Sequence, residues 1–214
     1  MRIVAAIGGS ILLQDYNAER FKEYAKLLKE QSEEHEIFVV VGGGKPAREY
    51  IGVVRDLGAG EAKCDDIGIE VTRVNAKLML LALGDAAYQK VPHNFQEALE
   101  YSATGKIVVM GGTEPAHSTD AVSAILAEYV QADLLVNLTA VDGLYTKDPK
   151  KYDDAVKYDT LTFTQVLNDQ LNVMDMTAAT MCRDNKLPIL VFDMAEGNFE
   201  KAVKGETIGT LVTE

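Results

Sequence analysis

Three glycine turns, each placed directly after an apolar run, constrain the fold of this chain more than any other feature. The turns are Gly8-Gly9, Gly42-Gly43-Gly44 and Gly111-Gly112, after runs at 2–7, 37–41 and 107–110. Short apolar runs rich in β-branched residues predict buried strands, and buried strands predict a parallel sheet covered on both faces. Ligands bind beyond the carboxyl ends of such strands. We therefore expect the three turns to meet at one edge of the sheet and to form one site.

The triple glycine at 42–44 has the features of a phosphate-binding turn. Pro46 follows it and suits the first position of a helix. Glycine lets a backbone approach a ligand closely, and a helix N-terminus offers free N–H groups to an anion. Lys45 and Arg48 add two positive charges. One such turn is equally well explained as a tight strand-to-helix connection, but three together favour a ligand that carries several phosphates.

Apolar residues at helical spacing fill the intervals between the predicted strands. In the segment 17–33, for example, Asn17 is suited to cap a helix whose apolar face follows a spacing of three and four. Further strands are predicted at 87–91, 134–138, 189–192 and 207–212, and a surface loop at 146–160. Helices are predicted at 17–33, 46–57, 66–83, 94–101, 120–131, 163–170, 174–185 and 198–204. This alternation predicts a three-layer α/β/α sandwich with a mainly parallel central sheet, in one domain over 1–214.

Composition narrows the classes of partner. The chain of 214 residues carries a formal net charge of -12, which argues against a nucleic-acid or anionic-membrane partner because it has no basic excess. No apolar run approaches the roughly 18 residues of a membrane span. The two cysteines, Cys64 and Cys182, form no CxxC pair, and no signal peptide is visible. A reduced, cytoplasmic setting is expected.

The familiar nucleotide-binding fingerprints are absent. The segment Gly42-Gly43-Gly44-Lys45 lacks the spacing and the Ser or Thr of a GxxxxGK[ST] loop, and no GxGxxG follows a strand. Phosphate binding in this chain must therefore be assembled from several turns instead of one loop.

Several stretches, taken in order along the chain, resemble the amino acid kinase superfamily. Within it, the chain is most similar to the UMP kinases of the short archaeal-type branch. The stretch Val141–Pro149 (VDGLYTKDP) is specific to the superfamily, and the loop 111–121 (GGTxPxxxTDA) indicates UMP. The other matching stretches are Gly8-Gly9-Ser10, Val41–Gly44, Val173-Met174-Asp175, Arg183-Asp184 and 188–192, of which the last three follow the bacterial pattern.

The resemblance implies transfer of the γ-phosphoryl group of ATP to UMP, with Mg²⁺, in pyrimidine nucleotide synthesis, by a homohexamer. It implies an acceptor and phosphate half over roughly 1–138 and an ATP nucleoside half over 139–214. The residues implied to bind ATP are Gly8, Gly9, Ser10, Gly44, Arg48, Thr139, Tyr145 and Asp148. Those implied to bind UMP are Gly43, Asp65, Thr113, Glu114, Pro115, Ala116, His117, Ser118 and Thr119. Catalytic roles fall to Asp120, Arg48 and Lys45, and the metal ligands stay unknown.

Most of these residues also have a purely structural interpretation. Asp65 could cap a helix starting near 66, and Asp120 could cap the helix that it opens. Arg48 could be a solvated helix charge, and Tyr145 could belong to the core. A lone loop histidine such as His117 is more often an exposed bystander than an acid or base. Asp142 is expected to brace its own turn, and Asp175 is a weaker site candidate.

The chain departs from the superfamily pattern at the first glycine turn. Many members carry a lysine two residues before it, and some carry another just after it, where this chain has Ala6 and Ser10. Ala140 likewise stands where relatives often have a polar residue. These departures leave two alternatives open. One is another small-molecule phosphate kinase of the superfamily, such as an isopentenyl phosphate kinase. The other is a non-catalytic nucleotide-binding or storage protein.

Overall fold

A seven-stranded sheet lies at the centre of the molecule in the computed structural model, which describes residues 1–171, 174–195, 197–206 and 208–214. The strand order is β3-β2-β1-β4-β6-β7-β5, and every pair is parallel except β6 and β7. The strands are β1 (Arg2–Ile7), β2 (Glu36–Val41), β3 (Val108–Met110), β4 (Leu134–Thr139), β5 (Thr160–Thr162), β6 (Ile189–Asp193) and β7 (Thr210–Thr213). The mainly parallel sheet is confirmed.

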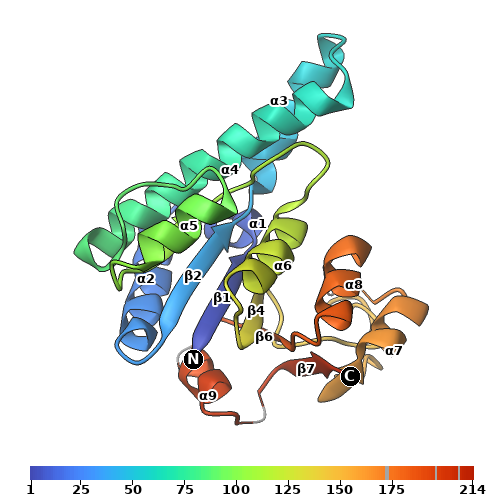
Figure 1. Ribbon diagram of the computed structural model, residues 1–214. Coiled ribbons are helices and arrows are strands. Elements are labelled where there is room, and N and C mark those ends of the chain that lie inside the picture. Colours follow the sequence, from blue (N-terminus) through green and yellow to red (C-terminus); the bar gives the residue numbers. More distant parts are fainter. Residues whose placement is uncertain (172–173, 196, 207) are drawn as a thin grey trace.

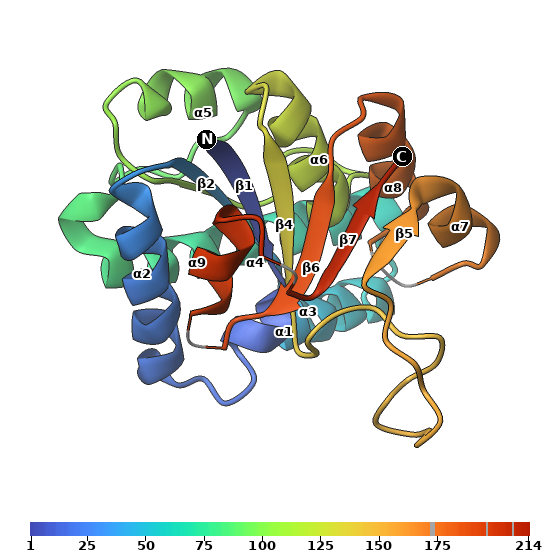
Figure 2. The ribbon, with the colours of Figure 1, turned by 90° about the horizontal axis from the view of Figure 1, so that it is seen from below.

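Helices cover both faces of this sheet, which explains why its central strands are mostly apolar. In β1, Ile3 and Ile7 pack with α2, α4 and α9, whereas Val4 packs with α5, α6, α7 and α8. Figure 2 shows these two layers on either side of the sheet. The helices are α1 (Gly9–Leu12), α2 (Ala18–Ser32), α3 (Gly44–Asp56), α4 (Glu61–Leu83), α5 (Phe95–Ser102), α6 (Thr119–Tyr129), α7 (Phe163–Asn168), α8 (Met176–Asp184) and α9 (Asn198–Val203). The three-layer sandwich is therefore also confirmed.

The order of the strands reverses between β1 and β4. From β1 the chain adds β2 and then β3 on one side, and it returns to place β4 on the other side of β1. In open α/β sheets a crevice forms at such a reversal, beyond the carboxyl ends of the two strands. The fold therefore directs a ligand to the ends of β1 and β4, next to the first glycine turn.

Helices α3 and α4 run side by side and project beyond the sheet, with their connecting turn at the tip (Figure 1). In the helix predicted at 66–83, apolar residues at helical spacing mark one face, which could serve either the core or a partner subunit: Ile67, Val71, Val74, Leu78 and Leu81. This face does not join the core. Val74 is 54% exposed and Leu81 is 76% exposed, whereas Ala76 and Met79 are fully buried. Core packing therefore does not account for the outer apolar stripe of α4.

The alternative interpretation of Asp65 and Asp120 as helix caps is wrong. Helix α4 begins at Glu61 after the extended residue Gly60, so Asp65 lies inside the helix instead of capping it. Helix α6 is capped by Ser118, whose hydroxyl accepts a hydrogen bond from the Ala121 N–H, so Asp120 lies within the first turn. Both carboxylates therefore have no capping role.

Other boundaries differ by a few residues. The chain after Gly8 forms the short helix α1, which the sequence did not predict, and α3 starts at Gly44, which places Pro46 two positions inside it. In the predicted strand 87–91 the one pairing in the described part of the chain is a bridge from Ala87 to Ile107. Strand β5 was also missed. Residues 173 and 207, which the predictions used, lie outside the described residues.

Among the residues that the structure describes, no helix is both long enough and apolar enough to cross a membrane.

Candidate active site

Two adjoining hollows lie at the carboxyl ends of β1 and β4. The wide hollow, of about 560 Å³, is bounded by the glycine turns at 8–9 and 42–44 and by α4. The narrow hollow, of about 270 Å³, lies between the ends of β1 and β4. Four residues line both hollows: Gly8, Ser10, Thr119 and Asp120. A ligand in one hollow would therefore meet a ligand in the other at these four residues.

The first two glycine turns are in direct backbone contact. The Gly42 N–H donates to the Ile7 carbonyl at 2.9 Å, which joins the second turn to the end of β1. A Cβ on Gly9 would lie 2.3 Å from the Gly42 carbonyl oxygen and 2.5 Å from the Gly44 nitrogen. A side chain at Gly9 cannot be accommodated without moving this turn, so the glycine is required by contact between two backbones.

Replacing Gly9 with Ala is expected to lower the free energy of unfolding by about 1–3 kcal/mol, because the added carbon is forced against backbone atoms. Gly8→Ala is the matched control. Its Cβ would meet its nearest neighbour, the Ile11 side chain, at 3.6 Å, and the φ of -60° at Gly8 suits alanine. Urea unfolding of both variants checks the prediction, and equal midpoints would contradict it.

The two basic side chains next to the triple glycine, Lys45 and Arg48, are placed differently with respect to the hollows. Arg48 lines the wide hollow, and it is the one Lys or Arg among the described residues to line either hollow. No hydrogen bond or ion pair within the described part of the chain engages its guanidinium. The Lys45 ammonium instead pairs with Glu49 at 3.5 Å on the exposed side of α3. Ala6 and Ser10 do line the narrow hollow, so the lysines absent from these positions would have faced it.

Asp120 lies where the two hollows meet. Burial raises the pKa of its carboxyl group, and the nearby charge of Asp175 raises it further, against the hydrogen bond that the Asp175 N–H donates to Asp120 at 3.3 Å. A partly buried carboxylate without a cationic partner costs free energy. Its position therefore favours a cation arriving with a ligand.

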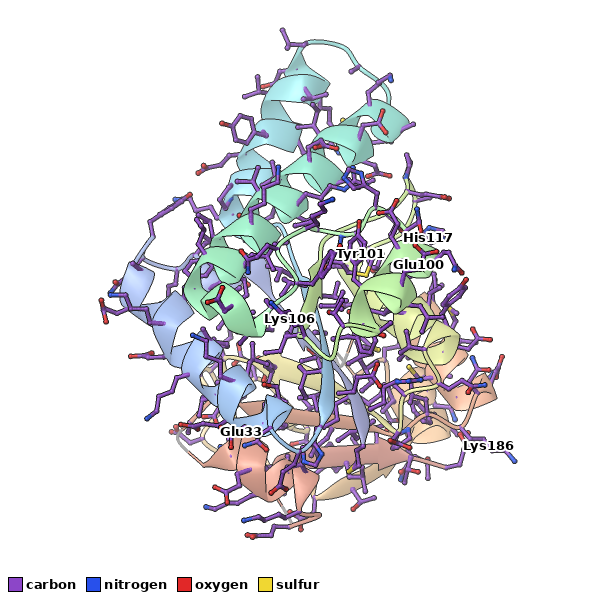
Figure 3. The ribbon with its side chains drawn as sticks, turned by 60° about the vertical axis from the view of Figure 1, so that its left-hand side comes forward. Glu33, Glu100, Tyr101, Lys106, His117 and Lys186 are labelled. Atoms are coloured by element: carbon purple, nitrogen blue, oxygen red, sulfur yellow. The ribbon has the colours of Figure 1, made fainter. Side chains whose placement is uncertain are left out.

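The loop between β3 and α6 is tied to α4 and to α8. The Asp65 carboxylate accepts a hydrogen bond from the Ala116 N–H at 2.8 Å. Ser118 donates to the Asp175 carboxylate, which also caps α8. His117 lines the wide hollow and lies at the surface (Figure 3). Of the other loop residues, Thr113 is partly buried, whereas Glu114, Pro115 and Ala116 are exposed.

The residues predicted for the ATP nucleoside are only partly brought together. Thr139 lines the narrow hollow, and its hydroxyl donates to the Val141 carbonyl at 2.6 Å. Tyr145 lines neither hollow; its hydroxyl donates to Asp142 at 2.6 Å, and this hydrogen bond is the main cause of a lowered pKa at Asp142. Asp142 therefore braces its own turn, as expected. Asp148 also lines neither hollow and lies 3.5 Å from the Lys151 ammonium on the surface.

Sequence reasoning missed three buried polar side chains. Thr72 and Asn75 on α4 reach the glycine turns, and Asn137 on β4 lines the narrow hollow. Each is less than 9% exposed. One feature of the sequence could have indicated them: each is a polar residue within a helix or strand whose neighbouring residues are largely apolar. In α4 the apolar residues at helical spacing form the stronger pattern, and Thr72 and Asn75 lie outside it.

The match to known proteins covers almost the whole chain. The model of the amino acid kinase family matches residues 1–193. The chain belongs to the amino acid kinase family. It is 63% identical to the uridylate kinase of Methanobrevibacter smithii, in an alignment that spans 99% of each chain.

Solved structures of the family share the fold. The chain superposes on the uridylate kinase of Archaeoglobus fulgidus with a TM-score of 0.91 and 44% identity, over the full length of both chains. The UMP kinase of Bacillus anthracis gives a TM-score of 0.88 at 26% identity, over 99% of this chain and 95% of that one.

Proposed function

We propose that this chain is a UMP kinase that transfers the γ-phosphoryl group of ATP to UMP, giving ADP and UDP. The observation that carries the proposal is the full-length identity of 63% to a uridylate kinase, together with two hollows that meet at four shared residues. Transfer between two phosphates needs the donor and the acceptor to meet in line. One hollow for each nucleotide provides this arrangement.

In the proposed arrangement UMP occupies the wide hollow. Asp65 accepts hydrogen bonds from the ribose hydroxyls, and the loop 113–119 surrounds the base. Arg48 and Gly43 bind the acceptor phosphate, because the guanidinium forms strong paired hydrogen bonds to phosphate oxygens. ATP enters through the narrow hollow, with its phosphates over Gly8, Gly9, Ser10 and Gly44 and its nucleoside near Thr139, Tyr145 and Asp148. Lys45, to which the resemblance gave a catalytic role, has no part in the proposed arrangement, since its ammonium pairs with Glu49 and it lines neither hollow.

A magnesium ion fits this site only together with nucleotide. Among the described residues, no group of three or more His, Cys, Asp or Glu side chains could hold a metal. Mg²⁺ is commonly held by one or two carboxylates with substrate phosphates and water, and the partly buried carboxylate of Asp120 is such a donor. When bound, the ion neutralises charge that develops on the transferring phosphoryl group.

The proposal is tested by measuring ADP formation while the phosphate acceptor is varied. UMP should support turnover, and CMP and isopentenyl phosphate serve as the alternatives. If isopentenyl phosphate alone gave turnover, the enzyme would be a different phosphate kinase of the family. If ATP and UMP bound without any ADP formation, the protein would instead be a nucleotide-binding protein. The wide hollow contains Asp65, Thr72 and His117, which suits a polar acceptor better than an isoprenoid chain.

The proposed enzyme works in pyrimidine nucleotide synthesis in the cytoplasm. Both cysteines are buried and free, as a reducing compartment allows. Burial raises the pKa of Cys182 to about 12, so this side chain remains a thiol at neutral pH.

A homohexamer is the proposed assembly. Support comes from the outer apolar stripe of α3 and α4, where Tyr50, Val53, Leu57, Val74 and Leu81 are each at least 54% exposed. Tyr50, Val53 and Val74 line one shared hollow, and contiguous exposed apolar surface marks interaction sites. Analytical ultracentrifugation should give about six times the chain mass of 23.3 kDa. A single species at the mass of one chain would contradict this assembly.

A further inference from the structure

Helix α4 carries two buried polar side chains one turn apart. Thr72 is 6% exposed and Asn75 is 3% exposed. Each forms hydrogen bonds to the backbone of a glycine turn that lies far away in the sequence. Burying a polar group is costly unless it is satisfied, and here the partners are the turns that shape the candidate site.

Thr72 holds the third glycine turn. Its hydroxyl accepts a hydrogen bond from the Gly112 N–H at 2.6 Å and donates one to the Ile69 carbonyl at 2.6 Å. The turn lies so close to the helix that a Cβ on Gly111 would come within 2.5 Å of the same hydroxyl oxygen. Because both partners belong to the protein, the hydroxyl is engaged in fixing the turn.

Asn75 holds the second glycine turn. Its side-chain nitrogen donates to the Gly42 carbonyl at 2.9 Å and to the Gly43 carbonyl at 3.2 Å. Both partners are acceptors, so only the amide nitrogen can face them. The Gly42 carbonyl oxygen is also the atom that excludes a side chain from Gly9. Asn75 therefore fixes the place where the first two glycine turns touch.

We propose that Thr72 and Asn75 are positioning residues for phosphoryl transfer, through which one helix sets the spacing between the acceptor loop and the phosphate turns. This inference rests on the proposed function. The same helix carries Asp65, which holds the acceptor loop at Ala116. Thr72 acts on the acceptor side, through Gly112. Asn75 acts where donor and acceptor meet, so the two residues are expected to affect different kinetic constants.

Two variants of Thr72 provide a matched pair. Thr72→Val keeps the shape of the side chain but removes the hydroxyl, and leaves the buried Gly112 N–H without a partner. The KM for UMP is expected to rise about 10-fold or more, with the KM for ATP within about twofold of wild type. Thr72→Ser keeps the hydroxyl and should restore the KM for UMP to within about twofold of wild type. A role in folding alone would not separate the two substrates.

The Asn75 variant should affect kcat more than the KM for UMP, in contrast to Thr72→Val. Asn75→Ala removes both donors, and kcat is expected to fall about 10- to 100-fold with a smaller change in the KM for UMP. If Thr72→Val and Asn75→Ala lowered kcat and raised both KM values alike, the positioning role would be overturned. The same holds if Thr72→Val matched wild type.

Amide hydrogen exchange separates a failure of this inference from a failure of the proposed function. In Thr72→Val the Gly112 N–H should exchange at least 10-fold faster than in wild type and Thr72→Ser, with or without nucleotide. Unchanged exchange would overturn the inference even if UMP were the substrate. A wild-type protein inactive with UMP would overturn the proposed function, and the exchange rate would still decide whether Thr72 fixes the turn.

Discussion

Replacing Arg48 with Ala is expected to lower kcat/KM for UMP by about 10²- to 10³-fold. Arg48 is the one Lys or Arg among the described residues that lines either hollow, and its guanidinium has no partner within that part of the chain. Superfamily members with lysines near the first glycine turn would share this task between several cations. In this chain Ala6 and Ser10 stand in place of those lysines, so Arg48 must neutralise more of the phosphate charge.

Lys45→Ala is the control for this variant. Lys45 lies three residues away on the same helix, but its ammonium pairs with Glu49 and it does not line either hollow. Its kcat/KM should stay within about threefold of wild type, as exposed ion pairs contribute little. Steady-state kinetics on both variants is the measurement. A larger loss for Lys45→Ala than for Arg48→Ala would reverse the assignment of the cation.

Replacing Asp120 with Asn is expected to reduce kcat by about 10²-fold or more while making the nucleotide-free protein more stable. The loss of activity follows from removing the partly buried carboxylate at the junction of the hollows. The gain in stability follows because the folded state disfavours the charge: burial raises the pKa of Asp120. An amide oxygen can still accept the hydrogen bond from the Asp175 N–H.

The pH dependence of the stability gain in Asp120→Asn tests whether the charge of Asp120 is its cause. Because the pKa of Asp120 is higher in the folded state than in the unfolded state, its contribution to stability is fully present below the ordinary value of about 4 and is lost as the pH rises through the folded value. Asp120→Asn should therefore exceed wild type in unfolding midpoint at neutral pH and approach it near pH 4. A variant less stable than wild type at neutral pH would contradict this explanation, and unchanged kcat would remove Asp120 from the site.

The sheet was the part of this molecule best predicted from sequence. Strands β1 and β2 are buried on both faces, so each appears as an apolar run followed by a glycine turn, and both were placed to within a residue. Strand β5 was missed because it has only three residues, two of them exposed, and no apolar run can mark it. Helix α4 started earlier than predicted, since its first turn is polar and Gly60 caps it without a side chain.

The sequence predicted the glycine turns that line the site, but it did not predict the side chains of α4 that hold these turns in place. Glycines at the ends of strands mark a site because the fold brings strand ends together, which the hydrogen bond between Gly42 and Ile7 illustrates. Which of Lys45 and Arg48 faces the hollow depends on how α3 is oriented about its axis. The sequence did not give this orientation, and α3 starts at Gly44, two residues before the predicted start. Asn75 could not be assigned to its turn, because nothing local in the sequence relates it to Gly42.

Transfer of label from ATP tests the central claim most directly. The protein is incubated with UMP, Mg²⁺ and ATP that carries a labelled γ-phosphoryl group, and the products are separated. The account predicts that the label appears in the terminal phosphate of UDP, in an amount equal to the ADP formed. Label found only in inorganic phosphate, or ADP formed at the same rate without UMP, would contradict it.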